Sequence, residues 1–471
     1  MKPITEWSLC DTASAIAARR VSAREVAEAT LARIAAHQPK LNAFARIDAL
    51  GALAAAKAAD QALAAGSHIG PLHGVPLAHK DMFYRPGLPV TCGSAIRRDF
   101  QPDILSTVLA RLDAAGAVTV GALNMSEFAN GPTGHNVHYG PTRNPWNTEH
   151  ITGGSSTGSG TAVAARLVYG SFGSDTGGSI RLPAGICGIY GIKPTQGRVS
   201  RYGAMGLSFS LDNIGPLART ARDCARQLAV VVGPDPNDPT AAPVAVEDYE
   251  GNVDTGIAGL RIAIPTNHYW DGMSPEVGDV LGAAIEILAR LGATVTRRSV
   301  PLHDVLRGLG TIVISAEFCA LHDDWLRNRH DEYAPLVRAR MKQGYAFSAV
   351  EYLKAVQVRP RIVKAFVEDV FATADAMLTP VLRFPVPKLT EVDVGDGERM
   401  NEVLGSLNHC TWPINYLGLP GLAVPAGFSK SGLPVGFQLA GRPFAEAMLL
   451  RIAGAYERES RWPDRVPSPP G

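Results

Sequence analysis

The spacing of apolar positions changes along the chain and separates helical from strand-like stretches. Residues 10–66 carry apolar residues at helical spacing and predict helices. Ser22 followed by Glu25 predicts a capping box at the start of the second helix. An alanine-rich run then favours a further helix that ends at Gly66.

Short apolar runs alternate with helical patterns after these first helices. The run GVPLAHKDMF predicts a buried strand that carries Lys80 on one face and His79 and Asp81 on the other. A predicted helix over residues 104–115 and a predicted strand over residues 118–122 follow it. This alternation predicts an α/β sandwich with helices against a sheet.

The second half of the chain continues the alternation. The stretch after residue 197 predicts a loop and then a helix, and residues 303–375 predict mostly helix. The later strand patterns are LRIAIP, TVTRRSV, ADAMLTPVL, GLAVPAGF and VGFQLAG. The C-terminal run RWPDRVPSPPG is expected to fray.

The composition and the net charge limit the kinds of partner that the protein is expected to bind. The 471 residues are 46% apolar, with a formal net charge of +1. A charge near zero gives no electrostatic reason to bind nucleic acid or an anionic membrane. We find no uncharged apolar run long enough to cross a membrane. We therefore expect a small-molecule partner, no nucleic acid and no membrane; a homodimer stays open as an alternative to a monomer.

The positions of the cysteines indicate which cellular compartment and which cofactors to expect. The six cysteines are scattered and form no C-x-x-C pair, so zinc and redox motifs find no support. Unpaired thiols fit a reducing compartment, and the N-terminal residues lack the apolar core of a signal peptide. We expect a cytoplasmic protein that uses neither a metal nor a cofactor.

The stretch from Thr152 to Arg198 contains two Gly-Gly-Ser steps, which end at Ser155 and Ser179. Paired glycines allow backbone angles that other residues resist. A serine held after such a bend can present its hydroxyl away from regular structure, as a nucleophile requires.

A serine nucleophile needs a base, and histidine is the usual one. None of the twelve histidines stands in a recognisable triad motif. Lys80 lies in an otherwise apolar run, where burial favours the neutral amine. Its position alone favours an ordinary solvated lysine, and the serine segment downstream makes Lys80 the better candidate for the base.

These segments closely resemble the signature of the amidase signature family. The motifs are GGSSTGSG, GSDTGGSIRLPA and GPLHGVPLAHKDMF, and the similarity extends from about Ser22 to the end of the chain. Thr157 and Gly160 depart from the usual GGSSGGSA but leave the catalytic positions filled.

The resemblance implies a fold, a mechanism and a set of site residues. The expected fold is one α/β/α domain over residues 1–471 with a large mixed sheet, its signature core at about 70–220. Ser179 is the implied nucleophile, Ser155 the implied cis-serine relay and Lys80 the implied base. The oxyanion hole should comprise the backbone N–H groups of Thr176, Gly177, Gly178 and Ser179. We expect Asp175 and Arg181, on either side of Gly178, to hold this turn by an ion pair or by backbone hydrogen bonds.

Two other classes compete with a stand-alone amidase. A nucleotide-binding loop is disfavoured because GGSSTGSG lacks the Lys-Ser/Thr ending of a P-loop. The family also includes the glutaminase subunit of the tRNA-dependent amidotransferase. There, the amino group of glutamine is held by an acidic residue that stands five places before the proline of a late run. The corresponding residue here is Asn408, in NHCTWPIN.

The expected activity is therefore hydrolysis of a carboxamide through an acyl-enzyme on Ser179, with esters or carbamates as further substrates. Asn408, His409 and Trp412 favour a more apolar or aromatic amide than glutamine. We expect helices over residues 303–375 to shape the pocket. Candidates for its wall are Met125, Asn130 and Trp412, and the alternative for each is a place in the core.

Overall fold

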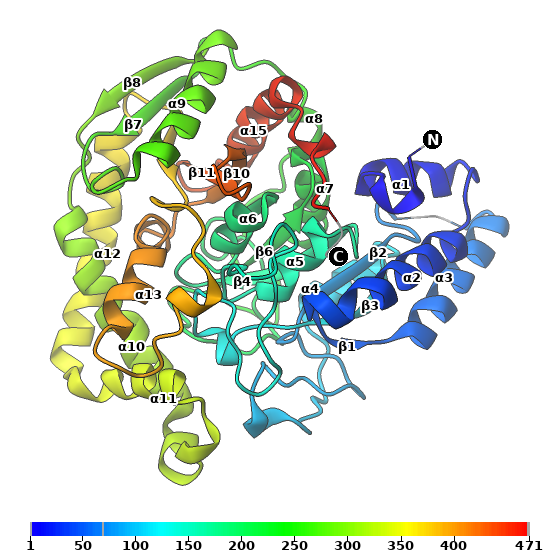
Figure 1. The fold of residues 1–471 in the computed structure, drawn as a ribbon, viewed down its shortest axis with the longest axis horizontal. Helices are drawn as coiled ribbons and strands as arrows, with labels where there is room; N and C mark the ends of the chain where they lie inside the picture. The colour runs from blue at the N-terminus through cyan, green and yellow to red at the C-terminus, as the bar shows by residue number, and fades with distance from the viewer. Residues whose placement is uncertain (1, 68–69, 469–471) are drawn as a thin grey trace.

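The computed structural model describes residues 2–67 and 70–468 and contains one sheet of 11 strands (Figure 1). Its order is β1-β3-β2-β4-β6-β5-β10-β11-β9-β7-β8. β2 runs parallel to β3 and β4, and β7 runs parallel to β8 and β9, while the central pairs are antiparallel. The strands are β1 Phe44–Ile47, β2 Pro76–Lys80, β3 Val118–Leu123, β4 Gly170–Asp175, β5 Tyr190–Lys193, β6 Asn213–Ala218, β7 Arg261–Pro265, β8 Thr294–Arg298, β9 Ala376–Pro380, β10 Gly421–Phe428 and β11 Pro434–Ala440.

Helices flank this mixed sheet, so the predicted α/β/α class is confirmed. The N-terminal helices lie at the β1 end, and α9 and α12 lie near β7 and β8 at the other end (Figure 1). The helices are α1 Leu9–Ala17, α2 Ala23–Leu41, α3 Ala49–Ala64, α4 Thr107–Ala114, α5 Thr157–Ala164, α6 Arg181–Cys187, α7 Ala221–Val231, α8 Tyr249–Asn252, α9 Pro275–Arg290, α10 His303–Asn328, α11 Pro335–Lys342, α12 Ala349–Val370, α13 Met400–Asn408, α14 Trp412–Tyr416 and α15 Glu446–Ser460.

The N-terminal region follows the predicted pattern with one addition. Ser22 and Glu25 form the capping box at the start of α2, as the spacing predicted. The short strand β1 between α2 and α3 was not predicted, and it pairs antiparallel with β3 at the edge of the sheet. A strand this short leaves too few positions for a period of two to show in the sequence.

The stretch after residue 197 corrects the prediction of a loop followed directly by a helix. Strand β6 lies there, ahead of α7, and pairs with β4 on one side and β5 on the other. Its sequence NIGPLA contains Gly215 and Pro216, which are depleted in central strands. All of its residues are buried, so pairing and packing outweigh local propensity here.

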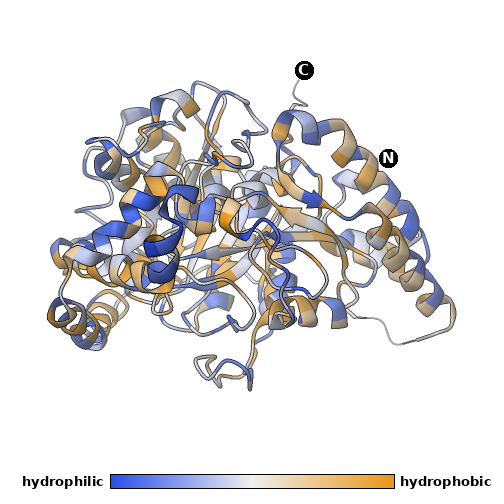
Figure 2. Ribbon diagram, turned by 90° about the horizontal axis from the view of Figure 1, so that it is seen from below, coloured by the Kyte–Doolittle hydropathy of each residue, from blue (hydrophilic) through white to orange (hydrophobic). Residues whose placement is uncertain are grey.

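The helix α10 is long and apolar enough to cross a membrane, and among the described residues it is the only such helix. In its most apolar window 44% of the residues are buried. The helix packs against α11, α12 and α14. In the view from below, orange hydrophobic and blue hydrophilic residues alternate along the outer helices, as expected for helices with one face against the protein (Figure 2).

The C-terminal run is anchored rather than frayed over the part that the structure describes. Trp462 is buried, and its Nε1–H donates to the carbonyl oxygen of Gly188 at 2.7 Å. Its ring packs against Phe428, with 4.8 Å between ring centroids. The prediction of a frayed tail is therefore wrong at Trp462, because the indole fills an apolar site; residues 469–471 lie outside the described part.

Candidate active site

The last residue of β2, Lys80, is completely buried beneath the signature segment. Its Nζ donates to Ser155 Oγ at 2.7 Å and to Ser174 Oγ at 2.9 Å. Burial lowers the pKa of Lys80 to about 7, against the opposing effect of the negative charges of Asp212 and Asp175. A lysine with this pKa is partly neutral at neutral pH, so its amine can accept a proton.

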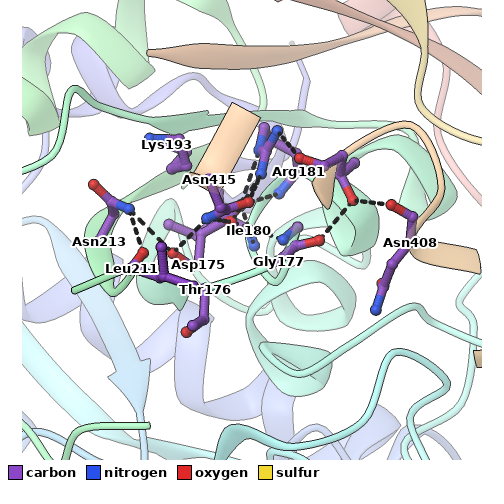
Figure 3. A network of polar contacts seen from close by, with 12 residues as sticks. Asp175, Thr176, Gly177, Ile180, Arg181, Lys193, Leu211, Asn213, Asn408 and Asn415 are labelled. Atoms are coloured by element: carbon purple, nitrogen blue, oxygen red, sulfur yellow. Dashed lines mark hydrogen bonds and ion pairs between the residues drawn. The ribbon is translucent and has the colours of Figure 1, made fainter. Parts of the chain in front are cut away.

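A second buried lysine, Lys193, lies near Asp175 at the end of β4 (Figure 3). Burial, aided by the charge of Arg181, lowers its pKa to about 7 as well. Its Nζ donates to the carbonyl oxygen of Pro194 at 2.7 Å. Both lysines therefore have the pKa of a base, but only Lys80 is hydrogen-bonded to the signature serines.

Ser155 follows a cis peptide bond from Gly154 and is fully buried. A Cβ atom on Gly154 would collide with the carbonyl oxygen of Gly131, so only glycine fits there. The carbonyl oxygen of Ser155 accepts a hydrogen bond from Ser126 N–H at 3.1 Å. These contacts fix the backbone that aims Ser155 Oγ at Lys80.

The turn after β4 carries Ser179, which is half-buried and faces a cavity. The backbone N–H of Ser156, the residue after Ser155, donates to the carbonyl oxygen of Ser179 at 3.3 Å. The two Gly-Gly-Ser steps are therefore side by side in space. In the described chain, Ser179 Oγ has no hydrogen bond of its own.

Asp175 holds this turn from inside (Figure 3). Its carboxylate accepts hydrogen bonds from the N–H groups of Gly178 at 2.8 Å and Ile180 at 3.1 Å, and it pairs with Arg181 at 2.9 Å. Burial opposes ionisation of Asp175, but the Arg181 charge and these donors hold the pKa of the carboxyl well below its usual range. The predicted ion pair and the predicted backbone hydrogen bonds are therefore both present.

The late run NHCTWPIN closes the other side of the turn. Thr411 Oγ1 donates to the carbonyl oxygen of Gly177 at 2.7 Å, and Asn415 Nδ2 donates to Asp175 Oδ1 at 2.8 Å. Gly178 has φ +130°, and a Cβ atom there would collide with Thr411. The run therefore supports the shape of the turn as well as contributing to the cavity wall.

The turn leaves some backbone donors free for an oxyanion. The N–H groups of Thr176, Gly177 and Ser179 have no acceptor within the described part of the chain. The Gly178 N–H, which we expected to contribute, already donates to Asp175. Three of the four expected donors are therefore available.

A cavity of about 330 Å³ opens over Ser179. Asn130 and Trp412 line it, as expected, whereas Met125 is 1% exposed and is not among the lining residues. Residues of α10 and α11 also line it, so part of the region 303–375 that we expected to shape the pocket lies at the cavity. The charged and titratable lining residues are Arg307, Arg340, His268, His303 and His409.

This wall is more polar than we would expect for the apolar or aromatic amide that the sequence favours. The described lining includes no Asp or Glu, and it adds three asparagines and Gln343 to the basic residues. Most of these residues come from α10, α11 and α13. A helical pattern in the sequence does not show that one face of a helix borders a cavity.

Several contributing residues were not assigned a role from the sequence. Ser174 contacts Lys80, and Asp212 accepts a hydrogen bond from Thr176 Oγ1 at 2.5 Å. Asp212 also accepts from the N–H of Leu207, a cavity residue, at 2.8 Å. Ser174 carries a sequence signal, since it stands two residues before Thr176 inside the motif; Asp212 does not, because its position depends on the tertiary path of the loop before β6.

Comparison with known proteins agrees with this architecture. The family model described as Amidase matches residues 25–450. A glutamyl-tRNA(Gln) amidotransferase subunit from Chloroflexus aurantiacus is 42% identical, over 96% of this chain and 96% of that protein.

Solved structures share the fold over nearly the whole chain. One such structure has a TM-score of 0.89 and 35% identity, and the match covers 96% of this chain and 98% of that one. It is described as a vestigial protein complex that reveals the evolutionary origins of an s-triazine catabolic enzyme. The corresponding glutamyl-tRNA(Gln) amidotransferase subunit from Thermotoga maritima has a TM-score of 0.84 and 30% identity, with 100% and 99% covered.

The mixed sheet and the signature segment define a hydrolase of carbon–nitrogen bonds with the amidase fold. The chain belongs to the amidase signature family.

Proposed function

We propose that the protein hydrolyses a small carboxamide through an acyl-enzyme on Ser179, with Ser155 and Lys80 as its proton relay. The observation that carries this proposal is the buried Lys80, hydrogen-bonded at 2.7 Å to Ser155 beside a serine that faces the cavity. Ester and carbamate cleavage would use the same acyl transfer.

The proposed first step forms the bond between Ser179 Oγ and the carbonyl carbon of the substrate. The Ser179 proton passes to Ser155 as the Ser155 proton passes to the neutral amine of Lys80. The oxyanion accepts hydrogen bonds from the free N–H groups of Thr176, Gly177 and Ser179. When the tetrahedral intermediate collapses, the C–N bond breaks and the proton returns through Ser155 to the leaving nitrogen. A water molecule then attacks the ester by the same relay and releases the acid and Ser179.

Ser179→Ala tests this proposal, with hydrolysis of simple amides and esters by the purified chain as the readout. We expect turnover to fall to the uncatalysed background while the melting temperature stays unchanged. Turnover by the variant near that of the wild type would refute the nucleophile assignment.

The second candidate function is the glutaminase step of a tRNA-dependent amidotransferase. The comparisons favour it, because the Chloroflexus aurantiacus relative carries the name of such an amidotransferase and aligns over nearly the full length of both chains. The side chain at position 408 favours a stand-alone amidase, because the neutral Asn408 cannot pair with an ammonium group as a carboxylate does.

Kinetics of the chain alone and with the other subunits of such an amidotransferase separate these candidates. We expect the chain alone to hydrolyse aryl or alkyl amides with a higher kcat/KM than glutamine. If glutamine is the best substrate, and only when the partner proteins are added, the amidotransferase function is correct.

We further propose that residues 1–471 form one amidase signature domain that acts in the cytoplasm without a cofactor. The single sheet, to which strands from residue 44 to residue 440 contribute, supports one domain. All six cysteines are free and buried, which fits a reducing compartment.

A further inference from the structure

Arg307 stands on the cavity-lining face of α10 without a partner. Its guanidinium forms no ion pair and no hydrogen bond with any residue that the structure describes. The Arg307 side chain lies against helix α13, and a Cβ atom on Gly405 of that helix would collide with Arg307 Nη2. Gly405 therefore leaves the space that brings this cation to the cavity, one helical turn from Asn408.

The indole of Trp412 lies between the turn that carries Ser179 and helix α10, which carries Arg307. A Cβ atom on Gly177 would lie 2.5 Å from Trp412 Cε3, and one on Gly310 would lie 2.8 Å from Nε1. The indole therefore fills the width between the oxyanion turn and α10, one helical turn beyond Arg307. Ser179 and Arg307 line the same cavity, so a ligand with its amide at Ser179 can extend toward the guanidinium.

Three histidine side chains line the cavity together with Arg307, and none of them brings a negative charge to it. His268 stacks on His303 and on His409, with ring centroids 4.6 Å and 4.1 Å apart. Burial lowers the pKa of His303 to about 3 and that of His409 to about 4, so these rings are neutral at neutral pH. They form a neutral polar wall next to the cation.

The charges of the cavity therefore have one sign. Arg307 and Arg340 are both cationic, and no described lining residue is acidic. Burial lowers the pKa of Arg340 to about 10, which leaves it protonated at neutral pH. An ammonium group in this cavity would meet no anion and would face two guanidinium groups, whereas a carboxylate would gain a charge-assisted hydrogen bond.

We infer that the end of the cavity around Arg307 is a subsite for a carboxylate of the substrate, and that the substrates are short dicarboxylic acid monoamides without an ammonium group. This inference rests on the proposed amide hydrolysis at Ser179 and names its substrate class. Arg307 is a specificity-determining residue, while the bond-breaking steps depend on the signature segment.

A matched set of three amides tests the inference with the full-length protein. Pentanamide carries no charge, glutaramate adds one carboxylate at the far end, and glutamine adds an ammonium group to glutaramate. We expect kcat/KM for glutaramate to exceed those for pentanamide and glutamine by about tenfold or more, the factor expected from one charge-assisted hydrogen bond.

Arg307→Met should abolish the preference, so that kcat/KM for glutaramate becomes equal to that for pentanamide. The matched control is Arg327→Met, on the exposed face of the same helix, which should change neither substrate. An unchanged ratio of glutaramate to pentanamide in Arg307→Met would overturn the assignment. So would a loss of that ratio in Arg340→Met alone, which would assign the subsite to Arg340 instead.

Calorimetric titration of Ser179→Ala with the same amides keeps the inference testable if turnover is slow. Tighter binding of glutaramate than of pentanamide, lost when Arg307→Met is added, supports the subsite even if the proposed chemistry fails. Equal affinity for all three amides refutes the subsite, while Ser179-dependent hydrolysis of pentanamide would leave the proposed function intact.

Discussion

Lys80 shows how one buried side chain acquires the properties of a base. Its position at the end of β2 removes the amine from water, and burial lowers its pKa to about 7. The apolar run around Lys80 indicated this burial in the sequence. The contact with Ser174 was not predicted, because it depends on how β4 lies beside β2.

A pH series of acylation rates checks the role of Lys80. The free amine is the active form, so the wild-type rate should rise with pH through about 7 and then level off. Lys80→Arg keeps a cation but has no available base, and its rate should fall by roughly 10²–10⁴-fold across the whole range. Substantial activity in Lys80→Arg with an unchanged pH profile would mean that Lys80 only fills space.

Ser174→Ala gives a finer test of the same amine. Ser174 Oγ accepts a hydrogen bond from Lys80 Nζ, which favours the protonated form, so its removal should lower the pKa of Lys80 further. We expect the midpoint of the pH profile to move to lower pH while the plateau rate persists. Ser159→Ala is the control, because Ser159 Oγ donates to the carbonyl oxygen of Phe172 instead. A midpoint that stays in place or rises would contradict this assignment.

The turn between β4 and α6 is the element that determines the site geometry. The signature motif predicted the turn, the ion pair and most of the free donors. It did not predict that the Gly178 N–H is occupied, because Asp175 accepts both this N–H and the Arg181 side chain. Support from Thr411 and Asn415 was also missed, since these residues are more than 200 positions away in the chain.

Arg181→Met tests the stability of this element. It leaves the fully buried Asp175 without its charge partner, so we expect the free energy of unfolding to fall by about 3–5 kcal/mol. Denaturant unfolding measures the change. Arg24→Ala removes an exposed pair with Glu28 and should leave the stability unchanged within error. An equal effect of the two substitutions would refute the structural importance of the buried pair.

The whole molecule brings segments from most of the chain to one site. The proposed base is Lys80, the proposed relay and nucleophile are Ser155 and Ser179, and part of the cavity wall comes from α10, α11 and α13. Hydrophobic periodicity predicted the α/β class and the helices over residues 303–375. It missed β1, β5 and β6, where a short length or an unfavourable local sequence hides strands that sheet pairing stabilises.

The basic character of the cavity is also a property of the whole molecule. Arg307 and Arg340 are ordinary surface-type residues in the sequence, and only the packing of α10, α11 and α13 places both on one cavity. The distribution of charge in the cavity could therefore not be predicted from local patterns, whereas the catalytic motif could.

Intact-protein mass spectrometry after rapid acid quench tests the central claim most directly. Wild-type protein mixed with an activated ester or amide should gain the mass of one acyl group, and the modified peptide should contain Ser179. Ser179→Ala should gain no such mass. Hydrolysis by the wild type without any acylated protein, or an acyl group mapped to another residue, would contradict the account.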